Sequence, residues 1–285
     1  MRVYHSFWTV PMIEKRFSWD IPARAEQMLM MAALGCVSAR TYGCHMVLHT
    51  DKLGKIIFDC IPYNEVYETC NDLHLPKIFW ASAKLVALGH EPLGSVHLDI
   101  DAFIQSRNCV SIINNTQADL LIQNTEGGEK WYKDQMHFVL RNTDRTGTPL
   151  EYSNFNNWDA YNCGIVKFNN EQLKQKYLEW YWNFANQISE KGANDDWYHC
   201  TMCIPDLILE QWMLREFAQQ GKHSVQELVG GWGCNGKEVG FCHLLGDAKT
   251  PEATRKARSL LQRMCPPVYE NVVRKLAEIP EMFEL

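Results

Sequence analysis

Two aspartates one residue apart, Asp99 and Asp101, follow an apolar run that begins after Gly94. The run is typical of a buried β-strand, and because Asp is disfavoured inside strands, both carboxylates are expected at its tip. Two acids in such a place are costly unless a cation meets them. Paired carboxylate oxygens suit Mg²⁺ or Mn²⁺. Alone the pair is a weak signal, because Asp-x-Asp also occurs in surface turns and helix caps.

Two further segments strengthen the interpretation. His243, Gly246 and Lys249 stand in an H-x-x-G-x-x-K spacing. A neutral imidazole can complete a metal shell that two carboxylates begin. Glycine lets the backbone approach a phosphate closely, and lysine supplies a compact positive charge for it. Asn162 and Gly164 form a small, polar N-x-G turn just before an apolar strand.

The elements that must position these residues alternate between strand and helix. Strands are expected over 3–8, 44–50, 55–58, 119–123 and 164–168, besides the one that ends at Asp99. Helices are expected over 23–38, 78–88, 173–184 and 204–217, with a closing helical region at 253–277 that Pro266 and Pro267 interrupt. This alternation predicts an α/β fold with a mostly parallel sheet. Such sheets bind ligands at the carboxyl ends of their strands, which is where Asp99 and Asp101 fall.

Composition narrows the function classes. The chain has 285 residues, of which 46% are hydrophobic, and this is enough for a substantial core. A net charge of −6 gives no general electrostatic support to a nucleic-acid partner. Eleven scattered cysteines, an odd number, favour buried free thiols in a reducing compartment. The first residues lack the apolar run of a signal peptide, and no stretch approaches the roughly 18 apolar residues of a membrane span.

These observations predict a cytoplasmic protein with no transmembrane segment. Peripheral association with a membrane or a glycan-assembly complex is compatible with the sequence, although no basic amphipathic segment requires it.

The order D-x-D, N-x-G and H-x-x-G-x-x-K resembles the family 8 glycosyltransferases, the glycogenin-like and lipopolysaccharide-galactosyltransferase group, and related uncharacterised bacterial proteins. The resemblance implies a single GT-A domain, the nucleotide-diphospho-sugar transferase fold, over residues 1–250. This domain has a mixed, mostly parallel central sheet flanked by helices. A C-terminal helical extension, residues 251–285, is expected to pack on the same domain.

The resemblance also implies an activity. A sugar moves from a nucleotide-diphosphate donor, with a UDP-sugar favoured, to a hydroxyl acceptor such as a glycan or polysaccharide precursor, and the anomeric configuration is retained. Asp99, Asp101 and His243 would hold Mn²⁺ or Mg²⁺ against the diphosphate. Lys249 and the backbone at Gly246 would neutralise its charge.

On the sugar side, the resemblance places Asn162 and Gly164 beside the donor sugar. Glu210 and Gln211 stand where the family often carries an acid followed by Gln, near the reacting sugar and the acceptor. Two departures from the family pattern leave the acceptor side and the exact donor contacts open. Cys163 replaces the usual Ala, and Thr250-Pro251 follows Lys249 where Pro-Trp is common.

Several positions have two interpretations. Phe7 and Trp8 end the first strand and could meet the nucleotide base or belong to the core. Asp51 could accept hydrogen bonds from a uracil or ribose, or cap the turn that follows it. Lys84 could reach the donor phosphate or ribose, or lie on a solvated helix face.

Other functions stay open as well. A sugar-phosphate nucleotidyltransferase would usually carry a glycine-rich phosphate loop after the first strand. In this chain the corresponding residues, 6–12, contain no glycine. A non-catalytic carbohydrate-binding protein with a degenerate GT-A fold fits the aromatic content, and Trp158 and Trp232 could line an acceptor groove. The Cys200–Cys203 pair lacks a second pair of ligands at a clear zinc spacing.

Overall fold

The computed structural model describes residues 1–13, 21–127, 136, 139–153, 157–191, 208–230, 236–244 and 249–283. The chain forms two compact units. The first comprises Met1–Asn71, Val96–Asn114 and Asn235–Leu285, and the second comprises Asp72–Ser95 and Asn115–Cys234. Each unit has its own strands and its own buried core.

The first unit contains a parallel set of strands, β1 (Arg2–Phe7), β2 (His45–Thr50), β3 (Glu65–Tyr67) and β4 (Val96–Leu98). Their order is β3-β2-β1-β4. The chain therefore runs outward from β1 to β3 and returns on the other side of β1 as β4. Such a reversal is a topological switch point, where open α/β sheets bind ligands beyond the carboxyl ends of the strands.

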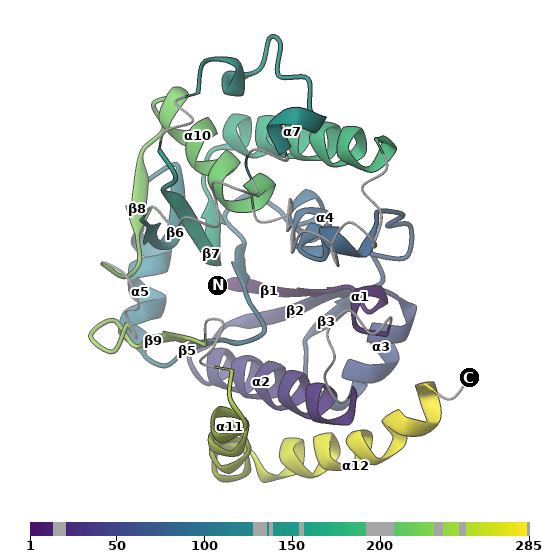
Figure 1. Cartoon of the computed structure of the whole chain (residues 1–285). Helices are drawn as coiled ribbons and strands as arrows, with labels where there is room; N and C mark the ends of the chain where they lie inside the picture. The colour runs from purple at the N-terminus through teal and green to yellow at the C-terminus, as the bar shows by residue number, and fades with distance from the viewer. Residues whose placement is uncertain are drawn as a thin grey trace. The chain divides into compact units, whose positions relative to one another are not determined.

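Helix α2 (Ile21–Thr41) lies along one face of these strands, and α11 (Pro251–Met264) and α12 (Pro266–Phe283) pack against its far side (Figure 1). Residues 29–39 of α2 are all buried, because apolar residues surround this part of the helix and it is covered on both sides. Thr250 caps α11, Pro251 occupies its first turn, and Cys265 separates it from α12.

Shorter elements complete the first unit. Two of them, β5 (Ala102–Ile104) and β9 (Phe241–His243), form an antiparallel ribbon in which Ala102 lies opposite His243. The others are α1 (Val10–Ile13), α3 (Lys52–Ile57) and the 3₁₀ helix η1 (Phe58–Cys60). Helix α5 (Arg107–Asn115) follows β5.

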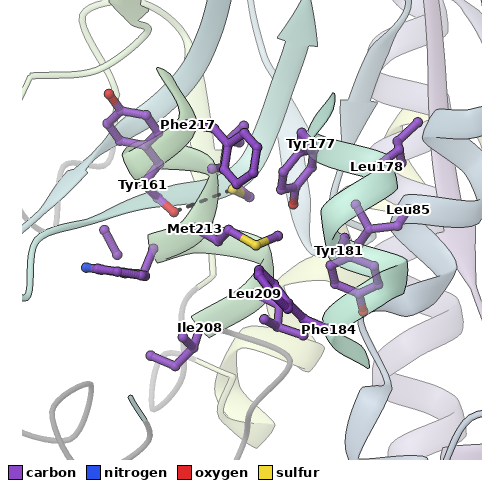
Figure 2. Close-up of a cluster of buried hydrophobic side chains, with 14 of the residues drawn as sticks. Leu85, Tyr161, Tyr177, Leu178, Tyr181, Phe184, Ile208, Leu209, Met213 and Phe217 are labelled. Carbon is purple, nitrogen blue, oxygen red and sulfur yellow. Dashed lines mark hydrogen bonds between the residues drawn. The ribbon is translucent and has the colours of Figure 1, made fainter. Parts of the chain in front are cut away.

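In the second unit, β6 (Leu120–Glu126) pairs antiparallel with β7 (Ala160–Phe168) and parallel with β8 (Val225–Glu227). Its helices are η2 (Lys77–Phe79), α4 (Ser82–His90), η3 (Pro149–Tyr152), α7 (Glu171–Glu190) and α10 (Met213–Gln220), with a π-helix η4 (Ile208–Trp212) directly before α10. Figure 2 shows how aromatic and aliphatic side chains from α4, α7, η4 and α10 meet in one buried cluster.

The α/β fold, its mostly parallel strands and the C-terminal helices confirm the expectations from sequence. The strand expected over 55–58 is wrong, since these residues belong to α3 and η1. The Asp51 side chain accepts a hydrogen bond from the Gly54 N–H and so begins a helix, which overrides the β-branched residues Ile56 and Ile57. Among the described residues, no helix has the length and apolar character needed to cross a bilayer.

We expect Gly240→Ala to destabilise the protein by several kcal/mol. Gly240 has φ +76°, and a Cβ built there lies 2.1 Å from the Ser106 Oγ. That hydroxyl cannot move cheaply, because it donates to the Val239 carbonyl and accepts from the Cys109 N–H. The left-handed backbone costs about 1–2 kcal/mol for alanine, and overpacking adds about 1–3 kcal/mol.

The matched control is Gly43→Ala, where φ is +84° and a Cβ meets nothing within 4 Å. This variant should lose only the backbone contribution in urea unfolding. Equal losses in the two variants would contradict the proposed steric clash at Gly240.

Candidate metal centre

Three potential metal ligands converge in the first unit, just beyond the carboxyl end of β4. Asp99 follows the last residue of β4, and the chain turns so that the Ala102 N–H donates to the Asp99 carbonyl at 2.9 Å. β5 then pairs with β9, and the Leu244 N–H donates to the Asp101 carbonyl at 3.1 Å. This pairing brings the end of β9, with His243, to the two aspartates.

The side chains are close enough to share one ion. One ligand atom from each of Asp99, Asp101 and His243 lies within 4.8 Å of the others. The His243 Nε2 is 3.6 Å from the Asp99 Oδ2 and 3.3 Å from the Asp101 Oδ1. Asp101 is buried, while Asp99 and His243 are half-buried. Two carboxylates and an imidazole in this arrangement match the donor types that bind a divalent transition metal.

Asp101 is the electrostatic centre of the cluster. Its Oδ2 pairs with the Nζ of Lys249, whose side chain is 39% exposed. Burial alone would raise the pKa of Asp101, but the charges of Lys249 and His243, with the hydrogen bonds they donate, hold that pKa well below its usual range. Asp101 is therefore an ionised carboxylate in a buried place, as a metal ligand must be.

A second layer of polar residues supports Asp99. His97 lies two residues earlier on β4, and its Nε2 is 3.9 Å from the Asp99 Oδ1 and 3.3 Å from the Ser6 Oγ. The Tyr4 ring packs against the His97 ring, with centroids 5.2 Å apart. His97 is buried, so these neighbours restrict the orientation of its ring beside the carboxylate.

His5 lies on the opposite face of β1, against α2. Its Nδ1 is 2.7 Å from the Tyr63 hydroxyl, and it is fully buried. A Cβ at Gly35 would lie 3.2 Å from the Ala102 carbonyl and 3.4 Å from the His5 ring, so glycine allows α2 to approach β5 closely. Burial lowers the pKa of His5 to about 4, although the negative charges of Asp99 and Asp101 partly offset it.

The other residues predicted for the first unit are Phe7 at the end of β1, Trp8 directly after it, Asp51 directly after β2, and Gly246. The Phe7 ring packs edge-on against Phe58, with centroids 5.1 Å apart, and Trp8 is a buried core residue. Asp51 accepts from the Thr9 N–H and hydroxyl at 2.8 and 2.7 Å, and from the Gly54 N–H at 2.7 Å. Gly246 lies outside the described residues.

Five other predicted residues belong to the second unit, on the three elements α4, β7 and η4. The Lys84 Nζ is 2.7 Å from the Glu210 Oε1, so this pairing differs from the solvated helix face considered for Lys84. Asn162 and Gly164 lie inside β7, so the turn expected before the strand is wrong. The Asn162 Oδ1 accepts from the Gly164 N–H at 2.9 Å, and its Nδ2 donates to Glu126. Gln211 follows Glu210 in η4 and is half-buried.

The residues of the aromatic and zinc hypotheses fall mostly outside the part of the chain that the structure describes. Trp158 packs partly buried against the hydrophobic cluster of the second unit. Trp232, Cys200 and Cys203 lie outside the described residues.

The residues that sequence reasoning missed are His97, Ser6 and His5. The signal for His97 was present, because residues two apart on a strand share a face, and His97 precedes Asp99 by two. No comparable signal marks His5, which faces α2 from the other side of β1.

Comparisons with known proteins give one family assignment. Residues 1–275 match a family described as a family of unknown function (DUF6734), and because the match spans most of the chain, the chain belongs to that family. No curated protein matches the chain. One similar solved structure is the apo form of mouse xyloside xylosyltransferase 1, at 13% identity and a TM-score of 0.39, covering 79% of this chain and 84% of that one. A likeness this low supports no conclusion about fold or activity.

The buried His5 predicts acid sensitivity. In the unfolded chain the His5 imidazole binds a proton below pH 6.5, whereas in the folded chain it stays neutral down to about pH 4. The contribution of His5 to the free energy of unfolding is therefore fully present above pH 6.5, and it falls by about 3 kcal/mol as the pH drops to 4. Urea unfolding at several pH values should show His5→Gln losing this slope, while exposed His74→Gln keeps it. An unchanged slope in His5→Gln would refute the assignment.

The hydrogen bonds that the Asp51 carboxylate accepts predict that removing this side chain destabilises the protein. Asp51→Ala deletes the helix cap and leaves the Thr9 hydroxyl and N–H without their acceptor. We expect the free energy of unfolding to fall by about 1–3 kcal/mol in urea titrations. Unchanged stability together with a lost affinity for UDP would instead assign Asp51 to nucleotide recognition.

Proposed function

We propose that this member of the DUF6734 family is a metal-dependent glycosyltransferase. It moves a sugar from a nucleotide-diphosphate donor, preferably a UDP-sugar, to a hydroxyl of a carbohydrate or other acceptor. The observation that carries the proposal is the meeting of Asp99, Asp101 and His243 with Lys249 at the carboxyl edge of β4. Two segments that are distant in the sequence thus supply the metal ligands and the lysine that together would hold a diphosphate.

The donor set favours Mn²⁺ over Mg²⁺. Carboxylate oxygens suit both ions, but Mg²⁺ is usually held by oxygen ligands alone, and an imidazole nitrogen fits a transition metal better. Asp99, Asp101 and His243 would hold the ion. When bound, it supplies positive charge that stabilises the leaving diphosphate.

Lys249 supplies the second positive charge. Its ammonium pairs with Asp101, but the side chain is partly exposed and can turn toward a phosphate. Charge on the leaving oxygens grows as the sugar–phosphate bond breaks, so a cation held there stabilises the transition state more than the ground state. Lys249 is therefore assigned to the diphosphate.

Glu210 is assigned to the reacting sugar and the acceptor. A carboxylate there can stabilise the positive charge that develops on the sugar carbon or take the proton of the acceptor hydroxyl. The Asn162 amide, oriented by Gly164 and Glu126, is assigned to the donor sugar. Retention of configuration rests on the resemblance to family 8 alone.

Thermal unfolding with Mn²⁺ and UDP tests the proposal. We expect the two together to raise the melting temperature of the wild type by about 5 °C at 100-fold excess over Kd, where binding contributes about 2.7 kcal/mol. Each alone should do less. Asp101→Asn should lose the joint effect, because it removes the ligand charge with little change in shape.

Asp59→Asn is the matched control, since Asp59 pairs with Lys275 elsewhere in the first unit and should keep the full response. The proposal fails if no nucleoside diphosphate among UDP, GDP, CDP and ADP stabilises the wild type in a Mn²⁺-dependent way.

A further inference from the structure

The second unit contains a buried ion pair that joins α4 to the π-helix η4. The Lys84 Nζ lies 2.7 Å from the Glu210 Oε1, and the two side chains are 14% and 3% exposed. Removing two such charges from water is costly, and an apolar pair of similar size is often equally stable or more so. A purely structural role therefore gives this pair no advantage over apolar residues.

The pair is buried, and the elements that carry it also contribute to an apolar cluster. Leu85 and Leu209, which adjoin Lys84 and Glu210 in sequence, both belong to the cluster of buried side chains in Figure 2. Tyr177 and Met213 lie in the same cluster. Attraction between opposite charges is stronger there than in water, and rotation of either side chain would bury an unpaired charge. The carboxylate is thus fixed in place by its lysine.

The backbone of Glu210 is fixed as well. The Tyr177 hydroxyl donates to the Glu210 carbonyl at 2.9 Å, and the Cys163 Sγ lies 3.9 Å from the same oxygen. The Tyr177 ring stacks on Phe168 of β7, with centroids 5.8 Å apart. Glu210 lies in a π-helix, an irregularity that is frequent at functional sites. Contacts from α4, α7 and β7 therefore converge on this one residue.

We propose that Lys84 is a positioning residue that keeps the Glu210 carboxylate ionised and oriented, rather than a ligand of the donor phosphate. This inference rests on the proposed function, in which Glu210 acts on the reacting sugar and the acceptor. A carboxylate as buried as this one would otherwise take up a proton and lose the charge it needs there. Lys84 acts on the reaction only through Glu210.

The experiment compares Lys84→Met and Lys84→Arg with the wild type. Carbon-13 labelling of glutamate carboxyls, with the Glu210 signal assigned by its loss in Glu210→Gln, reports the titration of Glu210. Release of UDP from UDP-glucose and UDP-galactose with Mn²⁺ reports turnover with water as acceptor. Thermal shifts with UDP and Mn²⁺ report affinity.

We expect Lys84→Met to raise the titration midpoint of Glu210 by at least one pH unit. UDP release should fall at least tenfold, while affinity for UDP with Mn²⁺ stays within about twofold. Lys84→Arg should recover part of the rate. If Lys84→Met does not fold, the Lys84→Met/Glu210→Gln double variant replaces it, and should be no slower than Glu210→Gln alone.

Lys174→Met is the matched control. Lys174 is another buried lysine of the second unit, but its Nζ donates to the Glu91 carbonyl at 2.6 Å. This variant should lose stability without changing the titration of Glu210 or the rate of UDP release.

In Lys84→Met, either of two results would overturn this inference without affecting the proposed function: an unmoved titration midpoint of Glu210, or an affinity for UDP that falls as much as the rate. A double variant slower than Glu210→Gln would do the same. A wild type that none of UDP, GDP, CDP and ADP stabilises in a Mn²⁺-dependent way would overturn the proposed function. The Glu210 titration would then still decide whether Lys84 keeps the carboxylate ionised.

Discussion

The antiparallel register of β5 and β9 is the constraint on which the candidate metal centre depends. Ala102 lies opposite His243, so the His243 imidazole lies beside the carboxylate of Asp101, the residue before Ala102. A slip of one residue would turn His243 to the other face of the ribbon. Backbone bonds fix the register at both ends, from Leu244 to the Asp101 carbonyl and from Gln105 to the Gly240 carbonyl. Gly240, in a conformation that favours glycine, makes the second of these bonds possible.

The protein places a lysine against a carboxylate in both units, with different consequences. Lys249 is partly exposed beside Asp101, so its ammonium can leave that carboxylate for a phosphate at little cost in desolvation. Lys84 is buried beside Glu210, and separating that pair would leave charges without compensation. The first arrangement suits a side chain that changes partners during a reaction. The second suits a carboxylate that must stay in one place.

Much of this architecture could be predicted from local sequence, because strand and helix periodicities and the aspartates at a strand tip are local signals. The pairing of Ala102 with His243 could not, since nothing in the periodicity of either segment selects the other. The H-x-x-G-x-x-K spacing and the chemistry of an imidazole single out His243, and the resemblance to family 8 assigns it to the metal. The strand prediction over 55–58 is wrong because the helix cap at Asp51 determines the conformation of the following turn more strongly than the two isoleucines do.

The residues of the second unit show the same limit. Lys84 and Glu210 were both identified from sequence, but with unrelated roles, since 126 positions separate them along the chain. The π-helix that carries Glu210 has no signature among the apolar positions of the helix expected there. Cys163 stood out as a departure from the family 8 pattern, but its contact with the Glu210 carbonyl depends on how β7 meets η4.

The central claim is that Asp99, Asp101 and His243 hold one divalent ion against a diphosphate. Anomalous diffraction from crystals grown with Mn²⁺ and UDP tests it directly. The account predicts one manganese peak within about 2.0–2.4 Å of oxygens of both aspartates and a nitrogen of His243, with the UDP diphosphate completing its coordination. Manganese bound elsewhere, or bound to the aspartates with His243 turned away and no diphosphate beside it, would contradict the account.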